Sequence, residues 1–161
     1  MAMRQRVAGA IVLALLLIAL LLYLYYPPLW LLSPGEYDNS TVTVTDASGD
    51  ELASVHVKIA DTRDKRYVGL SETDSLAADE GMLFVHDEAD TQDYVMRNMS
   101  FDLDIIFIDS DGTITDIQQA SADSDDTYSG YGQFVLEVNR GWASEHNITT
   151  GDIVEIPTDT P

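Results

Sequence analysis

The residues of this chain that could do chemistry are arginines, an amide and carboxylates that stand among short apolar runs. Most of them lie between Gly81 and Gly112, where three such runs crowd together, and one carboxylate lies in a later run. The candidate ligand-binding residues are Arg66, Met96, Arg97, Asn98, Asp104 and Glu137. Amide and charged groups that converge beside apolar strands are typical of a small-ligand pocket. We therefore expect a binding surface in this part of the chain.

Asp104 allows two interpretations, because it interrupts the otherwise apolar run from Leu103 to Ile108. Asp102 and Asp104 could act as a carboxylate pair in acid/base chemistry, since one pKa of such a pair is raised. Alternatively, Asp104 is a buried acceptor for an arginine or for backbone N–H groups, because buried charges are normally paired. We favour the second interpretation, with Arg66 or Arg97 as the partner. It predicts that Asp104→Ala destabilises the fold by a few kcal/mol, because the substitution would strand a buried cation.

Several classes of site are absent from the sequence. There is no cysteine, which excludes disulfides and thiolate chemistry. His56, His86 and His146 lack zinc-binding spacing, and no G-x-S-x-G motif is present. The Asp-rich stretches at residues 109–112 and 123–126 lack the Gly and Glu of a calcium loop. We predict no metal site, no cofactor and no catalytic residue set.

The charge of the chain is extreme, with 28 acidic residues against eight Lys plus Arg and a formal net charge of −20. Nucleic acid is excluded as a predicted partner, because its binding requires Lys and Arg that neutralise phosphates. A dispersed acidic surface with only two lysines is typical of a protein that works in high salt, where its self-repulsion is screened. We interpret the chain as halophilic, and an unfolding midpoint that rises between low and molar salt would support this.

The N-terminal segment predicts a membrane anchor. Residues 7–26 form an uninterrupted apolar run, and about 20 such residues span a bilayer as a helix. Arg4 and Arg6 precede the run and no cation follows it until Lys58, so the positive-inside rule places the following domain outside the cytoplasm. A cleaved signal peptide is the alternative, although its apolar region is typically shorter. We expect an anchor over residues 1–32, a linker over 33–40 and one domain over 41–157.

The elements that position the candidate residues are expected to be short strands separated by turns. Alternation over residues 41–45 and 54–59 predicts a β-hairpin, and Thr62 is placed to cap a short helix that reaches Leu70. Further strands are expected at residues 82–86, 92–98, 103–108, 113–119, 134–139 and 153–156, with a second short helix at 141–146. The fold class is therefore mainly β, an antiparallel sandwich or barrel with one or two short helices.

Two surface features follow from the same pattern. Residues 120–133 are rich in Ser, Asp, Gly and Tyr and are expected to form a long loop, which could act as a lid over the binding surface. Three N-x-[ST] sequons begin at Asn39, Asn98 and Asn147, and they matter because the domain is expected outside the cell. Asn39 and Asn147 are the candidate glycosylation sites, since Asn98 lies in the centre of the domain.

Six motifs occur in a fixed order along the chain. They are Arg66-Tyr-Val-Gly69-Leu70, Gly81-Met-Leu-Phe84, Tyr94-Val-Met-Arg-Asn98, Leu103-Asp-Ile-Ile-Phe-Ile108, Leu136-Glu-Val138 and Gly151-Asp152. Through them, residues 42–156 resemble the family called domain of unknown function 192. The chain departs from the family pattern where Ser71 stands for Met, Val95 for Trp, Arg97 for Lys, Met99 for Thr, Asp102 for Pro and Arg140 for Ala. The resemblance implies a small, mainly β domain, often behind a signal or anchor, and implies no activity.

Together these patterns predict a membrane-anchored, extracytoplasmic domain that is a binding or accessory module for an unidentified small molecule, glycan or protein. The alternatives are a hydrolase of cell-surface polymers that uses Asp104 or Glu137, and a purely structural envelope protein. A cavity with two carboxylates about 5 to 9 Å apart would favour the hydrolase. Asp104 buried against an arginine without a cavity would favour the structural protein, and a cavity without a carboxylate pair would favour the binder.

Overall fold

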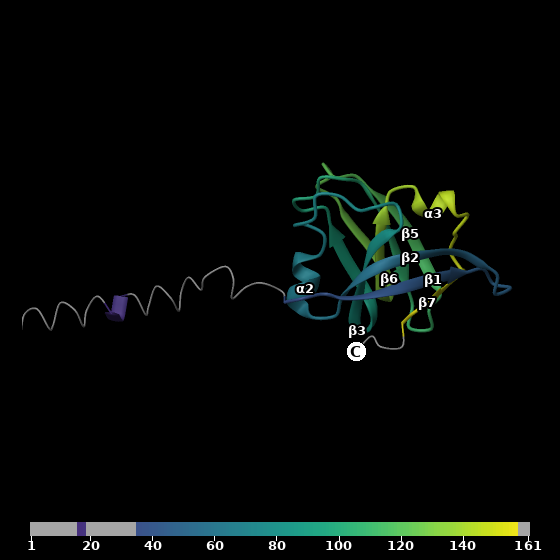
Figure 1. Ribbon diagram of the computed structural model, residues 1–161, viewed down its shortest axis with the longest axis horizontal. Coiled ribbons are helices and arrows are strands. Elements are labelled where there is room, and N and C mark those ends of the chain that lie inside the picture. The colour runs from purple at the N-terminus through teal and green to yellow at the C-terminus, as the bar shows by residue number, and fades with distance from the viewer. Residues whose placement is uncertain (1–15, 19–34, 158–161) are drawn as a thin grey trace, which may run out of the picture. The chain divides into compact units, whose positions relative to one another are not determined.

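The computed structural model describes residues 16–18 and 35–157, and the chain divides into two units, residues 1–34 and 35–161 (Figure 1). In the first unit Leu16, Leu17 and Ile18 are helical and exposed. The rest of the predicted membrane span, residues 7–26, lies outside the described residues. Among the residues that are described, no helix is long and apolar enough to cross a membrane.

The second unit is mainly β, as predicted, and its seven strands form a single curled sheet, a half-barrel (Figure 1). The order of strands across the sheet is β5-β4-β6-β3-β2-β1-β7. The strands are β1 (Asp38–Thr45), β2 (Glu51–Ala60), β3 (Glu80–Val95), β4 (Leu103–Ile108), β5 (Ile114–Ala120), β6 (Thr127–Asn139) and β7 (Ile153–Glu155). Neighbouring strands are antiparallel except β2 and β3, which run parallel. Of the two predicted architectures, a sandwich or a barrel, the observed one is closer to the barrel, since a single sheet curls into a half-barrel.

The predicted hairpin and the last strand are confirmed. In β1, Val42 and Val44 are fully buried while the alternating Thr41, Thr43 and Thr45 are not, as expected for a strand with one dry face. In β2 the alternating positions Ala53, Val55, Val57 and Ile59 are buried, as is Ala60 at the end of the strand. Strand β1 begins at Asp38, earlier than the alternation indicated, and β7 closes the sheet against it. The pattern of period two therefore located these strands correctly.

Both faces of the central sheet are covered, which confirms the expectation for β4, whose six residues are all buried. One face packs Leu83, Ile106, Leu136 and Val138 against the short helix α3 (Trp142–Glu145) and the residues around it. The other face packs Met82, Phe84, Leu103, Ile105, Phe107 and Val135 against Leu70, Met96 and their neighbours. The direction in which a residue of β4 or β6 points therefore decides which of two separate environments it meets.

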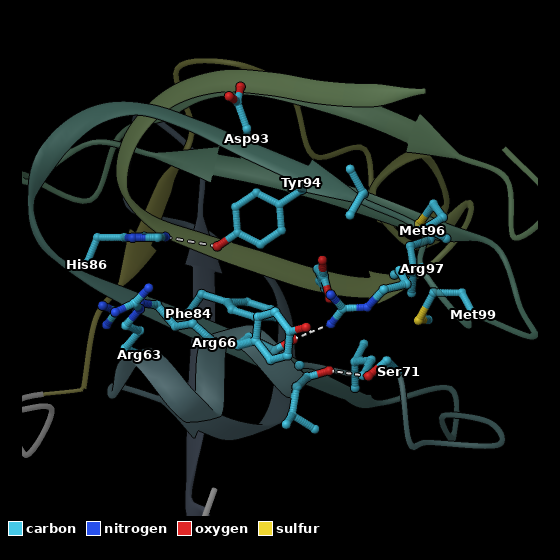
Figure 2. Close-up of a pocket in the computed structure, with 17 residues that line it drawn as sticks. Arg63, Arg66, Ser71, Phe84, His86, Asp93, Tyr94, Met96, Arg97 and Met99 are labelled. Atoms are coloured by element: carbon cyan, nitrogen blue, oxygen red, sulfur yellow. Dashed lines mark hydrogen bonds between the residues drawn. The ribbon is translucent and has the colours of Figure 1, made fainter. Parts of the chain in front are cut away.

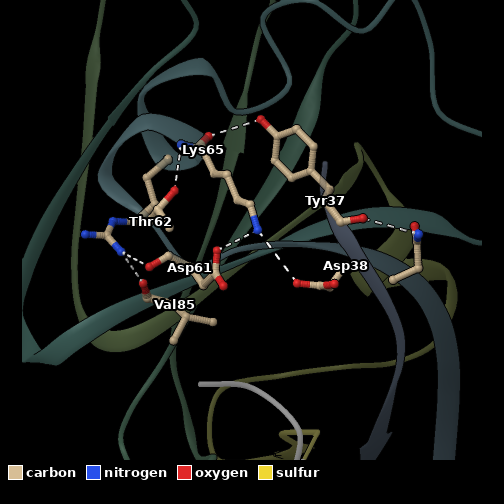
Figure 3. A network of polar contacts seen from close by, with 8 residues as sticks. Tyr37, Asp38, Asp61, Thr62, Lys65 and Val85 are labelled. Atoms are coloured by element: carbon tan, nitrogen blue, oxygen red, sulfur yellow. Dashed lines mark hydrogen bonds and ion pairs between the residues drawn. The ribbon is translucent and has the colours of Figure 1, made fainter. Parts of the chain in front are cut away.

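Helix α2 (Arg63–Val68) begins where the sequence predicts, because the Thr62 hydroxyl accepts a hydrogen bond from the Lys65 backbone N–H at 3.3 Å. Lys65 ties the helix to the start of β1 (Figure 3). Its buried ammonium lies 2.9 Å from Asp61 and 3.8 Å from Asp38, and the Tyr37 hydroxyl donates to the Lys65 carbonyl at 3.3 Å. These contacts hold α2 against the sheet.

Two expectations about strands and loops are wrong. Residues 82–86 and 92–98 were expected as separate strands, but β3 runs continuously from Glu80 to Val95, with an irregularity in its pairing with β6 between Val85 and Asp90. The expected long loop over residues 120–133 is mostly strand, since β5 extends to Ala120 and β6 begins at Thr127. Polar residues at the start of β6 form a strand because they pair with the second half of β3. The sequence pattern of one segment alone does not reveal such a pairing.

The two edges of the curled sheet meet at one end. Thr113, just before β5, bridges to Ile153 of β7, and backbone hydrogen bonds of 2.8 to 2.9 Å run between residues 112–114 and 151–154. The predicted turn at residues 109–112 brings the chain to this point, with the Gly112 N–H donating to the Asp109 carbonyl at 3.1 Å. The bridge therefore joins the first and last strands of the sheet order at this end.

Candidate functional site

A cavity of about 310 Å³ opens beside α2, beneath the outer half of β3 (Figure 2). Helix α2 and the residues after it supply one wall, and residues 93–97 with Met99 supply the other. Phe84, Leu70, Leu103 and Met96 give the cavity apolar surface, and Glu137 contributes a carboxyl from the central strand β6. The cavity therefore combines an apolar lining with a small number of polar groups, as ligand sites do.

The outer wall exists because the second half of β3 and the first half of β6 form an arm, residues 90–95 paired with 127–132, that folds over the sheet. Tyr94 points inward from the arm, and its ring meets Phe84 edge-on with centroids 5.1 Å apart, and Phe107 with centroids 6.1 Å apart. Gly130 crosses directly above Phe107, where a Cβ atom would lie 2.4 Å from the ring. Glycine at this position is what allows the arm to pack so closely.

The floor of the cavity next to the helix also depends on a glycine. Gly69 ends α2 with φ +51° and ψ −133°, a conformation that residues with a side chain rarely adopt. A Cβ atom there would lie 3.2 Å from the Phe84 ring. The Arg66-x-x-Gly69-Leu70 motif thus turns the chain into the cavity wall and lets Phe84 lie against it.

Glu137 is the most unusual group in the cavity. It is 6 % exposed, and among residues 35–157 its carboxyl has neither a hydrogen-bond donor nor a cationic partner. Burial disfavours the carboxylate and raises the pKa of Glu137 to about 8. At neutral pH the group is therefore mainly a neutral acid, which can donate one hydrogen bond to a bound molecule.

His86 and Tyr94 form a neutral pair beside it, with the His86 Nε2 and the Tyr94 hydroxyl 2.9 Å apart (Figure 2). Burial, and then the positive charge of Arg66, lower the pKa of His86 to about 4, although Asp87 opposes the shift. Burial, and then the Glu137 charge, raise the pKa of the Tyr94 hydroxyl well above its ordinary value. Near pH 7 both groups are uncharged, so neither compensates the arginines of the cavity.

Three arginines line the cavity: Arg63 and Arg66 from α2, and Arg97 from the segment after β3. The Arg66 Nη1 donates to the carbonyls of Asp61 at 2.9 Å and Val85 at 2.6 Å. The Arg97 Nη2 donates to the Tyr67 carbonyl at 2.7 Å, and its guanidinium lies 4.3 Å from the centroid of the exposed Tyr67 ring. Arg97 therefore reaches from the arm side to α2, as Figure 2 shows.

The structure brings four of the six predicted residues to one cavity: Arg66, Met96, Arg97 and Glu137. Asn98 has φ +57° and lines a neighbouring hollow of about 410 Å³ beside the acidic loop at residues 122–125. Asp104 lies elsewhere, because it pairs with Val138 across the strands and points to the opposite face from Glu137, which pairs with Ile105. The predicted surface is thus divided between the two faces of the sheet.

The expected ion pair between Asp104 and Arg66 or Arg97 is wrong. Asp104 is 1 % exposed, and its Oδ2 accepts a hydrogen bond from the Ala143 N–H of α3 at 3.0 Å, while no donor among the described residues reaches its Oδ1. Of the two buried-acceptor alternatives, the backbone N–H is the one observed. Asp102 lies outside the strand and pairs with Arg140 at 3.2 Å, so it forms no carboxylate pair with Asp104.

Sequence reasoning did not select His86, Tyr94, Tyr67 or Arg63. Two signals were present: Arg63 and Arg66 are three residues apart, which places them on one side of a helix, and Tyr94 shares its strand face with Met96. His86 carried no such signal, since only the fold of the arm brings Tyr94 to it. Within residues 16–18 and 35–157, no three His, Cys, Asp or Glu side chains are grouped to hold a metal ion.

Comparison with known proteins identifies the domain. A protein from Sinorhizobium meliloti 1021, whose structure is named a putative transcription regulator, is 32% identical and has a TM-score of 0.71, with 75% of this chain and 97% of that chain covered. A protein of unknown function from Novosphingobium aromaticivorans DSM 12444 is 32% identical with a TM-score of 0.68, covering 73% of this chain and 85% of that one. No curated protein matches significantly. The model of the family described as uncharacterized ACR matches residues 43–156, so the chain belongs to the domain of unknown function 192 (DUF192) family, as its motifs indicated.

Proposed function

We propose that the domain is a binding module whose ligand enters the cavity between α2 and the arm. The observation that carries this proposal is the Glu137 carboxyl, which is buried, faces the cavity and has no protein partner among the described residues. The carboxyl oxygens of Glu137 open into the cavity, and a buried polar group normally has a hydrogen-bond partner. A ligand in the cavity would supply that partner.

The hydrolase alternative loses support because no suitable carboxylate pair faces the cavity. Asp104 and Glu137 point to opposite faces of the sheet. Asp93, the other acid beside the cavity, lies next to the inward-pointing Tyr94 on an extended strand and points away from it (Figure 2). Its carboxylate accepts a hydrogen bond from the Ser129 hydroxyl at 2.5 Å. A glycosidase needs two carboxyl groups that flank the scissile bond. A cavity without that pair is the arrangement we associated with a binder.

The cellular setting remains part of the proposal. We infer from the sequence that residues 7–26 anchor the protein in the cell membrane, that the domain lies outside the cytoplasm, and that its surface suits high salt. Membrane fractionation with protease accessibility of the domain tests the first two points. The same charge argues against a role in binding nucleic acid, despite the name of the S. meliloti protein. Asn39 and Asn147, both exposed, remain the predicted glycosylation sites, which intact-mass measurement of the native protein would test.

The binding proposal is tested by methyl NMR of the full chain in mild detergent and molar salt. A fragment library of acids, amides, alcohols and amines is added, and the methyl signals of Met96 and Met99, which line the cavity, are followed. Ile108 and Ile114 are buried on the other face and serve as internal controls. We expect some fragments to shift the methionine signals and leave the isoleucine signals unchanged. If no fragment at millimolar concentration moves Met96 or Met99, the binding proposal is rejected.

A further inference from the structure

We propose that the ligand of this cavity carries a carboxylate, which the arginines of the cavity bind, attached to an apolar body. This inference rests on the proposed binding function and specifies its ligand class. The positive charge of the domain is concentrated at this cavity. Residues 35–157 contain only six Lys and Arg side chains, and three of them, Arg63, Arg66 and Arg97, line this one cavity.

These arginines have no carboxylate partner, although the protein is rich in carboxylates. In the described part of the chain, ion pairs within 4 Å involve only Lys65, with Asp38 and Asp61, and Arg140, with Asp102. Arg66 and Arg97 are held by backbone carbonyls instead, and Arg63 makes no hydrogen bond with the described residues. A carbonyl orients a guanidinium without neutralising it. Backbone contacts therefore position the charges of Arg66 and Arg97, and none of the three arginines is paired with a carboxylate.

The remaining groups of the cavity do not cancel this charge near pH 7. Glu137, His86 and Tyr94 are neutral there for the reasons given above. Asp93 is the other acidic residue of the lining, and its position on the arm gives its carboxylate the Ser129 hydroxyl as a hydrogen-bond partner. The cavity is thus a positive spot on a chain of formal charge −20. In molar salt the Debye length is about 3 Å, so the charges of the distant acids are screened. The electrostatic energy of a bound anion then comes mainly from its short contacts to the arginines.

The shape and chemistry of the lining favour a carboxylate over other anions. A planar guanidinium can donate two parallel hydrogen bonds to a carboxylate, and each of Arg66 and Arg97 uses only one terminal nitrogen on the protein. Phe84, Leu70 and Leu103 offer contact to an apolar chain or ring. Glu137 in its acid form can donate to an oxygen of the ligand, whereas a dianionic phosphate would favour more cations and fewer apolar walls. A carboxylate is therefore the anion that this lining fits best.

The test compares hexanoate with hexanamide, which have the same length but differ in charge, on the full chain in detergent at one fixed potassium chloride concentration. Binding is followed by the Met96 and Met99 methyl signals. We expect hexanoate to bind about tenfold more tightly or better, the equivalent of one charge-assisted contact. Arg63→Gln, Arg66→Gln and Arg97→Gln should each reduce this preference without changing the affinity for hexanamide. Arg140→Gln removes the same charge outside the cavity and should leave the preference unchanged.

The outcomes separate the two proposals. Equal binding of hexanoate and hexanamide, or an identical loss in Arg140→Gln, overturns the carboxylate inference. So does binding of hexyl phosphate without binding of hexanoate. Each of these outcomes leaves the proposed binding function intact, because a molecule still binds in the cavity. The same holds if hexanoate does not bind but another fragment of the library does, a result that also overturns the carboxylate inference. Arg63→Gln keeps the test valid if Arg66→Gln does not fold, because the Arg63 side chain is exposed and makes no contact that α2 needs.

Discussion

Replacing Glu137 by Gln tests the electrostatic description of the cavity most directly. The pKa of Glu137 is about 8 in the folded protein, against 4.5 for an ordinary glutamate. Because the folded pKa is raised, the unfolded chain loses its proton first as pH rises. The stability associated with the neutral acid is fully present below about pH 4.5 and is lost progressively as pH rises through about 8. Glutamine has the same shape and no proton to lose.

The size of the effect follows from the two pKa values. Each pKa unit is worth about 1.36 kcal/mol. Ionisation of Glu137 in the unfolded chain therefore lowers the free energy of unfolding of the wild type by about 3 kcal/mol at pH 7 and about 4 kcal/mol at pH 8, relative to low pH. We therefore expect the free energy of unfolding of Glu137→Gln, relative to the wild type, to increase by about 3 kcal/mol between about pH 4 and pH 7. All other titrating groups are shared by the two proteins and cancel in this difference.

The assay is urea unfolding at a fixed salt concentration, followed by the fluorescence of the buried Trp142 at a series of pH values. Glu155→Gln provides the control, since Glu155 is exposed on β7 and its replacement should leave the pH dependence parallel to that of the wild type. If the curves of Glu137→Gln and the wild type are also parallel, Glu137 is ionised in the folded state. Glu137 would then not be a neutral hydrogen-bond donor in the cavity.

Three further substitutions test the positions that build the site. Gly69→Ala should destabilise the fold by about 1 to 3 kcal/mol in thermal or urea unfolding, because φ is positive there and Phe84 lies close; an unchanged midpoint would contradict this conformation. Gly130→Ala should cost at least as much, since its Cβ would overlap Phe107, and combining it with Phe107→Leu should recover part of the loss; purely additive effects would contradict the close packing of the arm. Lys65→Met should cost about 3 kcal/mol, because it leaves the half-buried Asp61 carboxylate without its cation, and a loss below about 1 kcal/mol would mean that this pair is solvated.

Local patterns sufficed for the parts of the fold whose signals are local. The alternation in β1 and β2, the Thr62 cap and the turn at residues 109–112 each reflect the chemistry of a few neighbouring residues. Glu137, Arg66 and Arg97 were selected as polar groups beside apolar runs, and they do lie together.

The remaining features depend on pairings between distant segments. Whether Asp104 shares a face with Glu137 is set by the register of β4 against β6, which no single run reveals. The arm arises because residues 127–132 find partners in residues 90–95, so a polar stretch with loop-like composition becomes strand. The resulting contact between His86 and Tyr94, and the uncompensated state of the arginines, are consequences of that pairing rather than of composition.

The pairing of β7 with β1 has a consequence for how the domain folds. Residues 43–45 pair with residues 153–155, and this contact closes a loop that spans most of the domain. The bridge between Thr113 and Ile153 closes a second loop of about forty residues. Contacts between residues so far apart in sequence slow folding, because the entropy of closing the loop is lost before the contact forms. During synthesis β1 and the start of β5 must wait with unpaired backbone edges until the last strand has emerged. Kinetic competition with aggregation is then greatest for chains that are nearly complete.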